Sequence, residues 1–186
     1  NSWKTDNALE LQKWLEVIGN FDALISLANM AYNNPDLQYP QIADSEFEVC
    51  GKNIKHPMLD TKTSIGNDFC IQGKGSVNII TGANMAGKST FLRTVGLNMV
   101  IGMMGAPIPV DEFAFSPMMI FSSMRTEDSL AEQTSFFYAE LSRLAKISDI
   151  LKSGEKRFVI LDEILKGTNS HDKARGSYAF VEKMIN

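Results

Sequence analysis

The sequence predicts an α/β fold in which a sheet is flanked by helices and is preceded by a helical segment. Three observations lead to this prediction. A glycine-rich loop over residues 82–89 stands between an apolar run and a helical pattern. A second apolar run, residues 157–161, ends in two acids. Apolar residues also recur at helical spacing from residue 8 to about residue 32. Strands that alternate with helices around such a loop are typical of an α/β sheet.

The first predicted element is a helix over residues 8 to about 32. It is expected to end at residues 33–36, where Asn, Pro and Asp favour a turn. Its apolar positions share the three-to-four-residue spacing of one helical face: Leu11, Leu15, Ile18, Phe21, Leu24, Ile25, Leu27 and Ala28.

The segment after this helix predicts strands. Residues 46–50 alternate between apolar and polar side chains, which favours a strand. Residues 60–75 mix Gly, Asn and Lys and predict a loop with short strands. Residues 118–124 predict another strand, and residues 132–152 predict a long helix that ends at the polar stretch before residue 157.

The central motif is Gly82-Ala83-Asn84-Met85-Ala86-Gly87-Lys88-Ser89, which fits the phosphate-loop pattern G-x-x-x-x-G-K-[ST]. Residues 77–81 predict a short buried strand before it, and residues 90–100 predict a helix after it. In that setting backbone N–H groups and the helix N-terminus can surround a polyphosphate. Lys88 can reach the β- and γ-phosphates, and the Ser89 hydroxyl can bind Mg²⁺. A glycine turn that only lets strand and helix pack is the less favoured alternative.

The apolar run over residues 157–161 is followed by Asp162 and Glu163. An Asp at the end of such a strand can support Mg²⁺, and the neighbouring Glu can orient or polarise an attacking water. Without the glycine loop, a core strand that meets solvent would be the simpler interpretation. With the loop, the pair of acids favours a P-loop NTPase of the ABC type over a nucleotide kinase or a small GTPase.

Five segments, in order, resemble the MutS family. Residues 81–90 resemble its phosphate loop, in which Asn-Met is distinctive, and residues 161–172 resemble its Asp-Glu-Ile-x-x-Gly-Thr-x-x-x-Asp run. Residues 129–141 resemble the segment that carries a signature serine. Residues 55–59 are similar to a basic-His-Pro element, and residues 14–42 to the end of a long helical region.

The resemblance implies a DNA mismatch repair ATPase that binds ATP or ADP with Mg²⁺ and forms a homodimer through this domain. Phe69 would stack on adenine, although a plain core phenylalanine is an equally acceptable interpretation of it. Asn169 to Asp172 would form a loop that crosses the dimer interface. The residues implied as catalytic are Glu163, Lys88 and Ser135, the last acting on the nucleotide of the partner subunit. The residues implied in nucleotide binding are Phe69, Gly82, Ala83, Asn84, Met85, Ala86, Gly87, Lys88, Ser89 and Thr90, and those implied in Mg²⁺ binding are Ser89 and Asp162.

The resemblance also implies a division into a helical segment over residues 1–44 and a C-terminally truncated ATPase domain over residues 45–186. The switch histidine and the dimerising element of the family would then lie beyond Asn186. Ala83 and Ala86 stand where the family commonly has Pro and Gly, which suggests a divergent member. Because a Cβ penalises positive φ, Ala86 is expected to have negative φ.

Composition and charge narrow the class of protein. The net charge of −4 argues against a strong nucleic-acid-binding surface in this chain, so DNA contacts are expected from other domains. No apolar stretch is long enough to span a bilayer, and a cytoplasmic location with no membrane partner is expected. Cys50 and Cys70 are expected to be reduced, buried thiols. His56 and His171 are too few and too isolated for a metal cluster.

Two functions from different classes follow. The first is an ATPase module whose ATP-driven dimer switching is coupled to the binding of mismatched or structured DNA by other domains. The second is a nucleotide-gated protein-interaction module with little turnover and a role outside repair. The complete set of Lys88, Ser89, Asp162 and Glu163 favours the enzyme.

Overall fold

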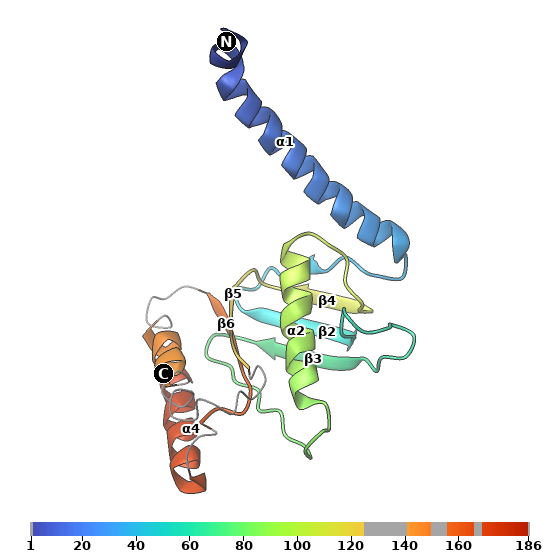
Figure 1. The fold of residues 1–186 in the computed structure, drawn as a ribbon. Coiled ribbons are helices and arrows are strands. Elements are labelled where there is room, and N and C mark those ends of the chain that lie inside the picture. Colours follow the sequence, from blue (N-terminus) through green and yellow to red (C-terminus); the bar gives the residue numbers. More distant parts are fainter. Residues whose placement is uncertain (1, 125–140, 150–155, 166–168, 186) are drawn as a thin grey trace, which may run out of the picture.

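The structure is a computed structural model that describes residues 2–124, 141–149, 156–165 and 169–185. It is a mixed α/β fold with two sheets (Figure 1). Residues 141–149 are helical. The other elements are, in chain order, α1 (Ser2–Asn33), β1 (Gln41–Ile42), β2 (Glu48–Ile54), β3 (Asn67–Gln72), α2 (Lys88–Met103), β4 (Glu112–Phe115), β5 (Met119–Ser123), β6 (Arg157–Leu161) and α4 (Ser170–Ile185).

The larger sheet has the strand order β1-β4-β2-β3. Strand β2 pairs antiparallel with both of its neighbours, so that Val49 lies opposite Ile71 on β3 and Phe115 on β4. Because side chains alternate along a strand, these residues share one face of the sheet. Helix α2 covers this face (Figure 1). The buried core there consists of Val49, Ile54, Val95, Met99, Ile108, Val110, Phe113, Phe115 and Met118.

Helix α2 approaches both sheets at glycines. A Cβ on Gly102 would lie 2.8 Å from Pro40 Cγ and 3.1 Å from Phe115 Cε1, and one on Gly96 would lie 2.7 Å from Ile160 Cδ1 on β6. The helix ends at Met103, and Gly105, the residue after the C-cap Met104, has φ of 82°. The N–H of Gly105 donates to Gly102 O and the N–H of Ala106 donates to Ile101 O. This pair of bonds is the Schellman motif, which satisfies the last carbonyls of a helix.

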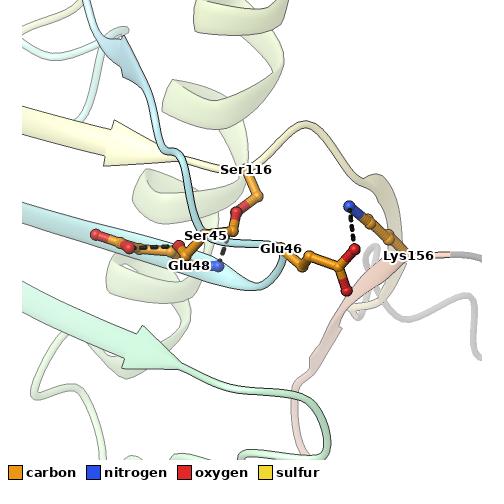
Figure 2. Close-up of polar contacts among 5 residues, drawn as sticks. All are labelled: Ser45, Glu46, Glu48, Ser116 and Lys156. Atoms are coloured by element: carbon orange, nitrogen blue, oxygen red, sulfur yellow. Dashed lines mark hydrogen bonds and ion pairs between the residues drawn. The ribbon is translucent and has the colours of Figure 1, made fainter.

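The smaller sheet consists of β5 and β6, which run parallel with Ile120 opposite Phe158. Polar contacts attach it to the larger sheet. Lys156 Nζ lies 3.6 Å from Glu46 Oε1, just before β2 (Figure 2). The Ser116 hydroxyl fixes the backbone there, since it accepts the Glu48 N–H at 2.9 Å and donates to the Ser45 carbonyl at 2.6 Å.

Helix α1 projects away from both sheets (Figure 1). It ends before Asn34 and Pro35, because a proline disfavours helical geometry in the residue before it. The Asn34 side chain donates to Met30 O and closes the last turn. Large apolar side chains along α1 are exposed, among them Trp14 (50%) and Phe21 (65%). In the part of the chain that the structure describes, no helix is both long and apolar enough to cross a membrane.

Most of the predicted elements are confirmed. The helix over 8–32 lies within α1, and the helix over 90–100 lies within α2. The strand over 46–50 corresponds to the first half of β2, that over 118–124 to β5 and that over 157–161 to β6. Of the long helix over 132–152, residues 141–149 are described and are helical, and the remainder lies outside the described residues. The division at residue 44 stays a prediction.

The predicted buried strand over residues 77–81 is wrong. Residues 76–83 have no regular secondary structure, and Ile79 is 77% exposed. An apolar run becomes a strand only where a neighbouring strand supplies hydrogen-bond partners, and no described strand pairs with this segment. The segment is attached instead by a side chain, because Asn78 Nδ2 donates to the Cys70 carbonyl at 3.1 Å.

The expectation of reduced, buried thiols is also wrong. Cys50 and Cys70 form a disulfide whose Cα atoms are 4.0 Å apart, and Cys70 is exposed. The register of β2 and β3 places the two residues directly opposite each other. The two cysteines are 20 positions apart in the sequence. A disulfide that closes a loop of that length stabilises the folded state by roughly 3 kcal/mol.

The two glycines of α2 give a matched test of its packing. Gly102→Ala should be less stable than Gly96→Ala by about 1–3 kcal/mol, because the Cβ at 102 meets the rings of Pro40 and Phe115, whereas Ile160 Cδ1 can rotate away from a Cβ at 96. Both substitutions gain the same helix propensity, so their difference isolates the contact. Urea unfolding of the two variants measures it, and equal midpoints would show that α2 has room at Gly102.

Candidate nucleotide-binding site

The glycine loop, residues 82–89, connects the irregular segment to α2. A turn closes its first half, with the Ala86 N–H donating to Ala83 O at 3.3 Å. Positive φ occurs at Met85 (62°) and at Gly87 (84°), the residue before the helix. Ala86 is not among the residues with positive φ, which confirms the expectation for that position. The left-handed conformation therefore falls on the neighbours of Ala86, where Gly87 adopts it without steric cost.

Lys88, the first residue of α2, folds back over this loop. Its Nζ donates to Gly82 O at 2.9 Å and to Ala83 O at 2.6 Å. The ammonium group is thus held on the inner side of the loop by two carbonyls. Ser89 is partly buried beside it, and Thr90 is exposed. The first N–H groups of a helix have no intrahelical acceptor, so the start of α2 offers donors to an anion.

Asn84 and Met85, at the tip of the loop, are exposed. The Met85 side chain is fully open to solvent, at 104%. Neither residue is placed by packing, which suits a loop that has to close around a ligand.

The two acids follow β6. The Asp162 N–H donates to Ser123 O at 2.9 Å and so extends the pairing of β5 and β6 by one residue. Glu163 has φ of 49°, so the chain turns sharply immediately after the strand. Asp162 is partly buried and Glu163 is exposed. The end of β6 therefore holds one carboxylate against the protein and presents the other to solvent.

A cavity of about 650 Å³ brings four of the predicted residues together. Lys88, Asp162, Glu163 and Phe69 all line it, although they come from α2, the end of β6 and β3. Residues 82–87 and Ser89 are not among its lining residues, so the loop lies outside its walls. The cavity thus joins a cation, two carboxylates and an aromatic ring, which are the side-chain types that the predicted chemistry requires.

Phe69 is partly buried and contacts α2. Its ring lies 5.7 Å from that of Phe91, centroid to centroid, in an edge-to-face arrangement. It also packs against the core cluster under α2. Phe69 therefore has a structural role as well as a position on the cavity wall, and both of the interpretations drawn from the sequence stay open.

Asn169 and Asp172 do not line the cavity. Ser135 lies outside the described residues. Asn169 and Asp172, expected in an interface loop, form a reciprocal cap at the start of α4: Asn169 Nδ2 donates to Asp172 Oδ2, and the Asp172 N–H donates to Asn169 Oδ1, both at 2.8 Å. Ser170 to Asp172 belong to the helix, so this part of the expected loop is wrong.

Lys74 and Asn78, which no sequence motif singled out, also line the cavity. Lys74 stands between Gly73 and Gly75, both with positive φ. The Gly-Lys-Gly triplet was a visible turn signal, because glycine adopts that conformation readily. No described group of three His, Cys, Asp or Glu side chains is close enough to hold a metal ion by itself.

Known proteins match nearly the whole chain. The MutS domain V family matches residues 78–186. The DNA mismatch repair protein MutS of Thermotoga maritima is 33% identical over 175 residues, covering 92% of this chain and 22% of that protein. The MutS proteins of Fervidobacterium nodosum and Chloroflexus aurantiacus are both 32% identical, over 95% and 92% of the chain and 20% and 18% of their own lengths. This chain therefore spans about a fifth of the length of these relatives, and it belongs to the MutS family.

Proposed function

We propose that this chain is the ATP-binding and ATP-hydrolysing domain of a MutS-like DNA repair protein. The observation that carries the proposal is the cavity that Lys88 shares with Asp162 and Glu163. A lysine at the head of a glycine loop and two acids at the end of a strand are far apart in the sequence, and they supply complementary parts of a phosphoryl-transfer site.

The lysine would bind the phosphates. The Lys88 ammonium is held by the Gly82 and Ala83 carbonyls, so it already lies where the loop folds inward. A polyphosphate would take over these bonds, since a charge-assisted bond to a phosphate oxygen is stronger than one to a neutral carbonyl. The donors at the start of α2 would then share the negative charge.

The remaining roles fall to the other predicted residues. Ser89 and Asp162 would hold Mg²⁺, which when bound neutralises charge on the phosphates. Two protein ligands suit this ion, because Mg²⁺ usually completes its coordination shell with water and phosphate oxygens. Glu163, exposed at the cavity edge, would orient the attacking water. Phe69 would pack against the adenine ring.

The switching function would need a second subunit. Ser135 would reach the γ-phosphate held by the partner, so that ATP stabilises the closed homodimer more than the open one and shifts the equilibrium between them. The chain is acidic overall, with a net charge of −4, so the DNA contacts would come from parts of the protein outside it.

The proposal is tested by steady-state ATP hydrolysis of the complete protein with perfect, mismatched and branched DNA duplexes. We expect hydrolysis that changes with at least one DNA, because ATP-driven closure is coupled to DNA held elsewhere. ATP binding without turnover, indifferent to all three duplexes, would favour a nucleotide-gated interaction module instead.

Lys88→Ala should weaken ATP binding by roughly 10- to 100-fold, the equivalent of losing one charged hydrogen bond of about 1.5–3 kcal/mol. Titration with a fluorescent ATP analogue measures the affinity. Lys52→Ala is the matched control, because Lys52 is exposed on β2 and pairs with Glu112 at 2.7 Å, outside the lining of the cavity. An unchanged affinity in Lys88→Ala would remove the glycine loop from nucleotide binding.

Glu163→Gln should retain ATP binding and lower turnover by roughly 10²- to 10⁴-fold, because the amide cannot accept a proton from water. The ATP-bound dimer should accumulate, which size-exclusion chromatography with bound-nucleotide analysis detects. Glu112→Gln on β4 serves as the control. Turnover equal to that of the unsubstituted protein would exclude Glu163 as the residue that activates water.

A further inference from the structure

The disulfide between Cys50 and Cys70 crosses from a central strand to an edge strand. Cys50 lies on β2, with Cys70 opposite it on β3 and Ala114 opposite it on β4. Val49 and Phe69 face the core under α2, so the alternation of side chains places the disulfide on the opposite face of the sheet. Cys70 is exposed and Cys50 is partly buried, which leaves the bond open to a thiol in solution on the side of Cys70.

Strand β3 contacts the segment that precedes the glycine loop and the helix that follows it. Phe69, the residue before Cys70, packs edge-to-face on Phe91, two residues after Ser89. The carbonyl of Cys70 itself accepts a hydrogen bond from Asn78, four residues before Gly82. Any shift of Cys70 therefore acts on the chain where it enters the loop and on the helix where it leaves the loop.

We propose that Cys50 and Cys70 form a reversible redox modification site that tunes nucleotide binding, an inference that rests on the function proposed above. The reacting partner would be a dithiol of low molecular weight or on another protein. Its thiolate attacks the sulfur of Cys70, the more exposed residue of the pair, and Cys50 leaves as a thiolate that takes a proton from water. The second thiol of the reductant then displaces Cys70, so that two cysteine thiols and one oxidised dithiol result.

The oxidised form should bind nucleotide more tightly. The bond between the strands holds β3 in the position that places Phe69 on Phe91 and the Cys70 carbonyl on Asn78. When the bond is reduced, β3 is an edge strand whose only strand neighbour in the described sheet is β2, and no covalent bond fixes its position on β2. Nucleotide binding must then restore the order that the disulfide maintains, and this ordering lowers affinity.

The test uses the complete protein, equilibrated with reduced or with oxidised dithiothreitol. Peptide mapping by mass spectrometry reports the bond between residues 50 and 70, and a fluorescent ATP analogue reports affinity in each state. We expect binding about three- to tenfold weaker after reduction, because preorganisation is lost. The variant Cys50→Ser/Cys70→Ser should bind with the affinity of the reduced protein under both conditions.

Single variants test the site of attack. Cys50→Ser leaves the exposed Cys70, which should react with a maleimide faster than the partly buried Cys50 left by Cys70→Ser. The reverse order would contradict attack at Cys70.

Three results would overturn the inference. These are absence of the bond under oxidising conditions, equal affinities in the two states, or a redox response that persists in the double variant. If the oxidised and the reduced protein bind the ATP analogue with equal affinity, only this inference is refuted. If neither form binds it, the proposed function is refuted as well.

Discussion

The packing of α2 against two sheets at once is the constraint on which the rest of the molecule depends. Gly102 brings the helix close to Phe115 of the larger sheet, and Gly96 brings it close to Ile160 of the smaller one. At Gly102 the rings of Pro40 and Phe115 leave no room for a Cβ, whereas at Gly96 a Cβ would require the end of the Ile160 side chain to move. Because the two sheets meet through this helix, its first residue, Lys88, lies at the same cavity as the acids that follow β6.

The same helix contributes to the core and carries the candidate site. Its buried face supplies Val95 and Met99 to the core, while its N-terminus carries the glycine loop. The core thus positions the site without contributing a reacting group. Asn98, fully buried in α2, donates to Lys55 O at 2.9 Å and so fixes the helix to the segment after β2. Such bonds hold α2 in one orientation, which the proposed phosphate site would require for catalysis by positioning.

Local patterns were sufficient to predict the glycine loop, α2, β6 and the two acids, because each depends on residues close together in the chain. The conformation of Ala86 was also predictable from the cost of a Cβ at positive φ. Features that depend on partners far away in the sequence could not be predicted from local patterns. Residues 77–81 are apolar but have no strand beside them in the described structure, and the pairing of Cys50 with Cys70 follows from a register that no short pattern encodes.

Helix α1 has a mechanical consequence. Its 32 residues make a rod of roughly 48 Å at 1.5 Å per residue. Its base is joined to the far end of α2, since Pro40 lies against Gly102 and the Gln38 and Ile108 backbones exchange two hydrogen bonds. A tilt of about 10° at this joint would displace the tip by roughly 8 Å, given that length. That displacement is comparable to the spacing of packed helices.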